Sequence, residues 1–178
     1  MAMVARVMFT GWLLAAQAKA QPANPRILTV CEALDKAAEY DGKVVIVVGA
    51  SSGTSEGSWI GEDCPGELVI DGRKWSYGIS TAYSLGEVDP PPQLPNGFRW
   101  DKKALGEKLT QVKETTKLEV LPQYHYSDRW MAIYGRLEAK ITRVEIRGDT
   151  RITYTGYGHL GNAPAQLVSP QGGWRRLR

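Results

Sequence analysis

The side chains that carry out most enzymatic chemistry are few and scattered in this chain. The two histidines, His125 and His159, lie far apart and outside any spacing that is typical of a metal site. The adjacent acids Glu62 and Asp63, near Trp59, point apart on a strand or loop, whereas a glycosidase needs two carboxylates facing each other across a cleft. We therefore interpret both acids as surface charge, and we expect no catalytic residue, no metal site and no cofactor.

A glycine-containing stretch follows the most apolar run, "VVIVVGASSG". It resembles the nucleotide-binding motif of short-chain dehydrogenases, because Gly49 and Gly53 match two of its glycines, although Ser55 replaces the last one. That motif needs a helix directly afterwards to hold the pyrophosphate. Here the next residues are rich in glycine and include Pro65, and the chain has no Tyr-x-x-x-Lys pair. We expect a loop between two strands, with its serines explained by loop composition.

The two cysteines, Cys31 and Cys64, form an even pair. In an exported chain such a pair predicts a structural disulfide, with two free thiols as the alternative. A redox-active pair is more often Cys-x-x-Cys, and a zinc site needs more ligands.

Hydrophobic periodicity predicts strands with two helices. Thr29 and Glu32 form a capping box at the start of a helix that ends near Gly42. A second helix is expected over residues 100–118, with Leu105, Leu109 and Val112 on one face. The first strands are expected at 43–49, around Trp59 and Ile60, and on both sides of a turn at Asp71-Gly72. Later strands are expected at 129–141, with a bulge near Thr142-Arg143, and after a turn at Gly148-Asp149.

A helix between the third and fourth strands is the layout of an OB-fold-like small antiparallel barrel in a mainly β (α+β) protein. A barrel also explains the near-continuous apolar strand after Lys43, because one face lines the interior and a helix can cover the other. A β-sandwich or a mixed α+β sheet is the alternative.

The segment "GYGHLGNAPAQLV", residues 156–168, is the most unusual in composition. Such barrels bind ligands on strands two and three and on the loops between strands 1–2 and 4–5. We therefore place a candidate binding site there. The alternative is a glycine-rich structural corner with the aromatic side chains in the core. The candidate residues are Trp59, Trp75, Tyr77, Tyr157 and His159.

Residues 1–20 have the order of a secretory signal peptide, with Arg6 before an apolar run and Ala18-Lys19-Ala20 as the cleavage pattern. A buried N-terminal helix is the alternative. Without this segment and the basic end from Arg175 onward, the formal charge of +3 disappears and acids slightly outnumber bases. This distribution disfavours nucleic-acid binding. We expect a flexible segment over 21–28, one domain over 29–169 and a flexible basic tail over 170–178.

The segments "VCEAL", "YDGKVVIVVG", "DCPG" and "GYGHLGNAPAQLV" resemble those of an uncharacterised family of small exported bacterial proteins with an OB-fold-like domain. The resemblance covers about residues 29–168 and implies location and fold without a reaction. We expect a non-enzymatic binding or accessory domain in the periplasm or outside the cell, without a stable membrane anchor, whose partner is an envelope protein or a glycan. An extracytoplasmic hydrolase acting on polysaccharide or peptide and an oligonucleotide-binding domain are the alternatives.

Overall fold

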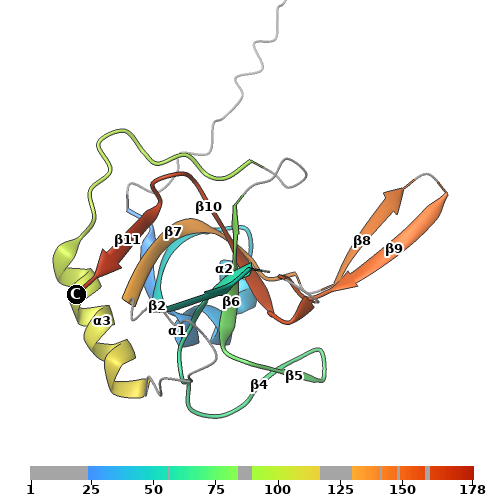
Figure 1. The fold of residues 1–178 in the computed structure, drawn as a ribbon, viewed down its shortest axis with the longest axis horizontal. Helices are drawn as coiled ribbons and strands as arrows, with labels where there is room; N and C mark the ends of the chain where they lie inside the picture. Colours follow the sequence, from blue (N-terminus) through green and yellow to red (C-terminus); the bar gives the residue numbers. More distant parts are fainter. Residues whose placement is uncertain are drawn as a thin grey trace, which may run out of the picture.

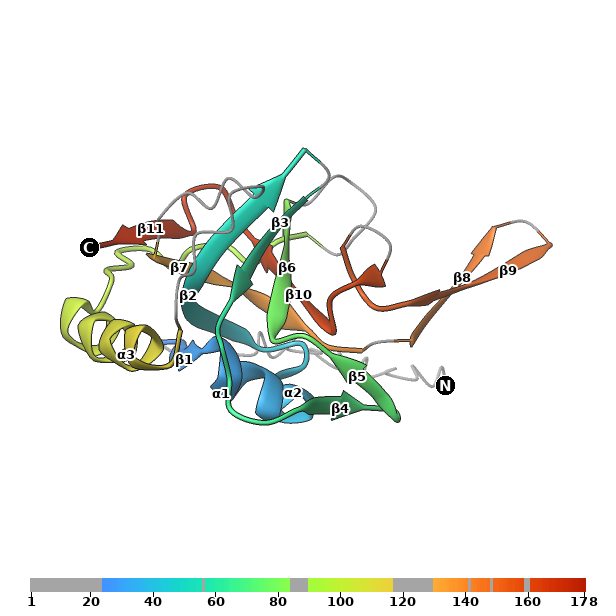
Figure 2. The ribbon, with the colours of Figure 1, turned by 60° about the horizontal axis from the view of Figure 1, so that its bottom comes forward.

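A closed five-strand barrel forms the centre of the protein (Figures 1 and 2). The structure is a computed structural model that describes residues 24–55, 57–83, 90–116, 130–140, 142–147, 149–158 and 161–178. In chain order the barrel strands are β2 (Val44–Thr54), β3 (Gly57–Gly61), β6 (Gly78–Tyr83), β7 (Trp130–Glu138) and β10 (Ala165–Ser169). They pair in the order β2-β3-β6-β10-β7, and β7 returns to β2 and closes the barrel.

The helix α3 (Lys102–Thr115) lies between the third and fourth barrel strands in the chain. The predicted OB-fold-like barrel is therefore confirmed, with one refinement. The pairing of β6 with β10 is parallel, and the other barrel pairings are antiparallel. The last barrel strand, β10, lies between β6 and β7.

The apolar strand β2 contributes to two cores because its side chains alternate between the two faces of the barrel wall. Val45 and Val47 belong to the cluster inside the barrel, with Ile60 and Ile79. Ile46 and Val48 point outward and pack under α3 in a second cluster. The second cluster also contains Leu105, Val112, Ala132 and Tyr134. This arrangement confirms that the run of valines has one face in the interior and one face under a helix.

Two short helices, α1 (Val30–Asp35) and α2 (Ala37–Tyr40), pack against one end of the barrel (Figure 2). The predicted capping box is present, because Thr29 Oγ1 accepts from Glu32 N–H and Glu32 Oε2 accepts from Thr29 N–H. The single helix expected here is divided at Lys36, whose backbone leaves the helical region.

The barrel is narrow enough that two wall positions admit only glycine. A Cβ at Gly135 would lie 2.7 Å from the carbonyl oxygen of Val168, and one at Gly49 would lie 2.8 Å from that of Gly61. The expected loop over the Ser/Gly stretch is therefore wrong, since β2 continues through it to Thr54 and pairs with β3. Gly49 is present because of close packing between strands and not to approach a phosphate.

Two hairpins form separate two-stranded sheets beside the barrel. In the first, β4 (Leu68–Ile70) and β5 (Arg73–Trp75), the turn residues Asp71 and Gly72 have φ of 51° and 74°, as the predicted type I′ turn requires. The second, β8 (Thr142–Arg147) and β9 (Thr150–Thr155), extends away from the barrel between its fourth and fifth strands (Figures 1 and 2). The bulge expected near Thr142-Arg143 is instead the start of this hairpin.

Both predicted flexible ends contain paired strands. β1 (Arg26–Thr29) runs parallel to β2, and β11 (Trp174–Leu177) runs antiparallel to β7. Each of these strands is only four residues long and adds to an existing strand. The proline-rich segment has no regular structure over residues 90–101, so the helix expected from residue 100 begins at Lys102. This segment packs Leu94, Phe98 and Trp100 beside Tyr134.

Candidate functional site

The outer face of β3 and β6 is built by two strands whose alternation is clear from their register. Ile60 pairs with Ile79, and both side chains are fully buried inside the barrel. The neighbouring pair, Trp59 and Ser80, therefore lies on the outer side of the wall, where the Ser80 residue is only 6% exposed. The helix α3 packs on β2 and β7, which leaves Trp59 half-buried.

Two glycines flank the indole of Trp59. A Cβ at Gly57 would lie 3.2 Å from the Cη2 atom of the ring, and a Cβ at Gly158 would lie 3.3 Å from its Nε1 atom and 2.9 Å from Ser80 Oγ. Gly158 has a φ of +71°, which a residue with a side chain rarely adopts. We call Gly57, Trp59, Ser80 and Gly158 the Trp59 face. The glycines leave room along the ring that any other residue would fill.

Trp75 and Tyr157, two of the other predicted binding residues, are buried on the inner side of the same region. Trp75 is 8% exposed and its Nε1 donates to Ile70 O, 3.4 Å away. Tyr157 is 2% exposed and its hydroxyl donates to Lys140 O at 2.9 Å. A Cβ at Gly156 would touch the Trp75 ring, at 2.9 Å. The structure thus brings Trp59, Trp75 and Tyr157 together around residues 156–158.

Tyr77 contacts a different element, because its hydroxyl donates to Asp35 Oδ1 of α1 at 2.9 Å. Desolvation and this hydrogen bond both raise the pKa of the Tyr77 hydroxyl. His159 and His125 lie outside the described residues.

A carboxylate and a disulfide meet beside the barrel end that α1 covers. The predicted bond between Cys31 and Cys64 is present, with 5.6 Å between the two Cα atoms. Glu62 is only 6% exposed, so the interpretation of this residue as surface charge is wrong. Its Oε2 accepts from Cys31 N–H at 2.9 Å and its Oε1 accepts from Thr115 Oγ1 at 2.9 Å.

Glu62 therefore stabilises the fold by joining α1 and α3. The N–H of Cys31, in the first turn of α1, has no partner within the helix, and the Glu62 carboxylate satisfies it. The contact with Thr115 ties the end of α3 to the same point. The Sγ atoms of Cys31 and Cys64 lie near this carboxylate in a group with metal-ligand chemistry, but here they are bonded to each other.

The segment Gly53-Thr54-Ser55-Glu56-Gly57 matches the Gly-x-Ser-x-Gly pattern of many serine hydrolases. In those enzymes the serine stands on a sharp turn between a strand and a helix. Here the segment connects two antiparallel strands, β2 and β3, and no helix follows. Ser55 is exposed at this connection.

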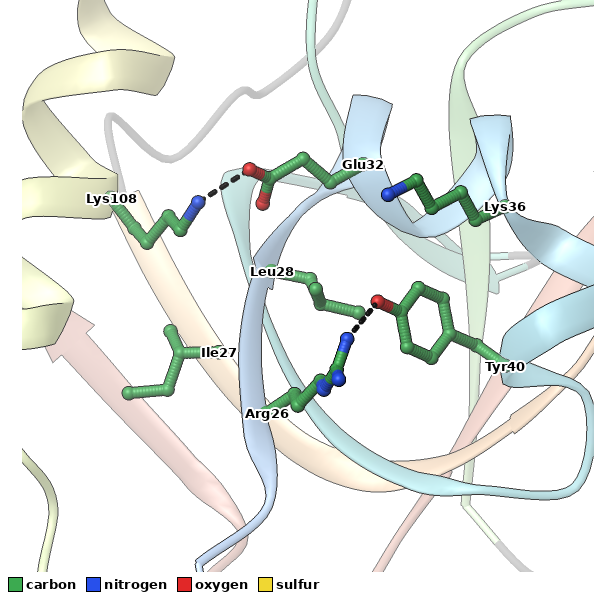
Figure 3. A pocket seen from close by; sticks show the side chains of 7 residues that line it. All are labelled: Arg26, Ile27, Leu28, Glu32, Lys36, Tyr40 and Lys108. Atoms are coloured by element: carbon green, nitrogen blue, oxygen red, sulfur yellow. Dashed lines mark hydrogen bonds and ion pairs between the residues drawn. The ribbon is translucent and has the colours of Figure 1, made fainter.

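Sequence reasoning missed a pocket between β1, α1, α2 and α3 (Figure 3). Its volume is about 320 Å³. In the close-up view, basic side chains approach it from three elements. The lining residues are Arg26, Ile27, Leu28, Glu32, Lys36, Tyr40 and Lys108.

Hydrogen bonds fix two sides of this pocket. Arg26 Nη1 donates to the hydroxyl of the buried Tyr40 at 3.1 Å, and Lys108 Nζ donates to Glu32 Oε1 at 2.5 Å. Partial burial of the Glu32 carboxyl opposes its ionisation, but the hydrogen bonds from Lys108 and Thr29 N–H outweigh this effect and lower its pKa. The residues that line the pocket lie far apart in the sequence, so no local motif indicates it.

The described helices include none that is long and apolar enough to cross a membrane. Comparison with family models, with curated proteins and with solved structures finds no match to this chain.

Proposed function

We propose that this protein is a non-enzymatic binding or accessory domain of the bacterial envelope and that the Trp59 face is its contact surface. The observation that carries the proposal is the half-buried indole of Trp59 on the outside of the second and third barrel strands. Barrels of this type bind oligosaccharides and oligonucleotides on that face and on the loops beside it.

The ligand that fits this face best is a glycan. A tryptophan ring offers a large flat apolar surface with a polar N–H at its edge. Within the described residues Trp59 Nε1 has no hydrogen-bond partner, so it is available as a donor beside Ser80 Oγ. The acid excess of the chain between its basic ends supports a neutral ligand over a nucleic acid.

An oxidising compartment agrees with this role. The Cys31–Cys64 disulfide is stable outside the cytosol, where thiols are not kept reduced. The order of charged, apolar and small residues up to Ala20 supports export with cleavage near that residue. The resemblance of four sequence segments to those of small exported bacterial proteins supports the same location.

The test is titration of the full chain with soluble oligosaccharides released from bacterial envelopes, followed by calorimetry. Trp59→Ala should weaken binding by at least about tenfold, the loss of roughly one stacked ring. Trp130→Ala is the matched control, because Trp130 is also half-buried but belongs to the cluster under α3. Equal affinity of the wild type and Trp59→Ala, or no binding of any oligosaccharide, would overturn the proposal.

The same samples separate the alternative functions. A hydrolase would shorten the oligosaccharides or a peptide substrate during the titration, which chromatography of the products detects. An oligonucleotide-binding domain would instead retain a single-stranded oligonucleotide with an affinity that falls steeply as salt rises.

A further inference from the structure

We propose that the pocket between β1, α1, α2 and α3 binds the phosphate group of a small molecule or of a larger envelope component. This site lies apart from the Trp59 face and does not depend on the function proposed for that face. It rests on the charges, the donors and the size of the pocket.

The charges around the pocket are not balanced. Its lining contains three bases, Arg26, Lys36 and Lys108, and one acid, Glu32, which is paired with Lys108. Arg26 is 3.6 Å from Glu39, but both side chains are largely exposed, so this pair neutralises little. Lys36 has no acidic partner among the described residues. A ligand with one or two negative charges complements the net positive charge of this lining.

The donors are partly fixed in place. Tyr40 is 3% exposed, and its hydroxyl holds Nη1 of Arg26 at the pocket. The Nε and Nη2 groups of Arg26 keep their N–H donors free within the described part of the chain. Figure 3 shows the Lys36 side chain directed toward the pocket from the α1–α2 junction. A planar guanidinium and a nearby ammonium are the usual partners of phosphate oxygens.

The size of the pocket limits the ligand. A volume of about 320 Å³ is at the lower end of ligand pockets, so a phosphate with a few further atoms fits. The apolar side chains of Ile27 and Leu28 border the charged groups on β1. They offer a surface for a short carbon skeleton attached to the phosphate.

The experiment is calorimetric titration of the full chain with inorganic phosphate, glycerol phosphate and a sugar phosphate at constant physiological ionic strength. Saturable binding of at least one of these probes is expected. Tighter binding of the organic phosphates indicates a headgroup on a larger molecule, and equal binding indicates free phosphate. Absence of saturable binding for all three would overturn the proposal.

Two lysine variants show whether the pocket itself binds. Lys36→Gln should weaken phosphate binding by about tenfold or more, because within the described pocket lining Lys36 is the lysine that no acidic side chain pairs. Lys43→Gln is the matched control, since Lys43 lies 5.8 Å from the centre of the Tyr40 ring and outside the pocket lining. Equal weakening by both variants would mean general surface attraction and would contradict the proposal. Trp59→Ala should leave phosphate binding unchanged.

Discussion

The two outer faces of the barrel wall differ in whether the helix α3 covers them. The face of β2 and β7 carries Ile46, Val48 and Ala132 and is covered by α3. The face of β3 and β6 carries Trp59 and Ser80 between glycines. Both faces have the same strand geometry, so the difference comes from the residues at alternate positions and from where the single long helix packs. The covered face contributes to stability, and the other is the contact surface in the function proposed above.

The largest expected effect tests the covered face. Leu105→Ala removes a side chain that is 2% exposed between α3 and the barrel, and it should cost about 2–5 kcal/mol of unfolding free energy. Urea denaturation followed by circular dichroism measures this change. Lys103→Ala, on the exposed side of α3, should stay within about 0.5 kcal/mol of the wild type. Similar losses from both variants would mean that α3 does not form the cover described above.

A smaller effect is expected where α1, α3 and the disulfide meet. Glu62→Gln replaces a charged group that accepts from both Cys31 N–H and the Thr115 hydroxyl by a neutral amide whose single oxygen accepts from only one of them. The loss should be about 1–3 kcal/mol, measured without reductant. Glu67→Gln is the control, because this exposed carboxylate makes only a surface ion pair with Lys74. No difference between the two variants would contradict the capping role of Glu62.

Trp59→Ala tests the face of β3 and β6, which α3 does not cover. Its ring is half-buried and adds little to either core cluster, so the variant should lose no more than about 1 kcal/mol of stability. Thermal unfolding of Trp59→Ala beside Leu105→Ala measures the difference between the two faces directly. A loss for Trp59→Ala as large as that for Leu105→Ala would remove the distinction.

The smallest effect concerns pH. Because the pKa of Glu32 is lowered in the folded protein, its ion pair with Lys108 stabilises the fold at pH values above the ordinary pKa of Glu. This contribution is lost as the pH falls through the lowered pKa. The carboxylate is about one-third exposed, so the loss should be only about 0.2–1 kcal/mol. In acid titrations of stability, Lys108→Met should lack this component while unfolding cooperatively.

Local signals predicted the parts of the fold that depend on neighbouring residues. The capping box at Thr29, the turn at Asp71-Gly72 and the apolar stripe of α3 each involve residues within a few positions of one another. The helix position between two groups of strands then indicated the barrel. The disulfide followed from the cysteine count and the expected compartment.

Features that depend on distant partners were not predictable from local pattern. β1 and β11 are short and charged, and each becomes a strand only because β2 or β7 offers a free position. Gly49 resembled a loop residue because its role depends on the approach of Gly61. Glu62 resembled a surface acid because its hydrogen-bond partners, Cys31 N–H and the Thr115 hydroxyl, lie far from it in the sequence.

The candidate functional residues also include some that the sequence predicted and some that it did not. Trp59, Trp75 and Tyr157 were all placed from the expected strands and loops of the barrel. In the structure Trp59 is half-buried, whereas Trp75 and Tyr157 are buried. The phosphate pocket was missed because Arg26, Lys36 and Lys108 come from three elements that share no motif.

The position of β10 has a consequence for synthesis of the chain. Its register joins Ile79 of β6 to Ala165 and Leu137 of β7 to Leu167, so the barrel wall stays open until residues 165–169 have been made. A nascent or truncated chain that lacks β10 presents two unpaired strand edges at once, and such edges promote aggregation.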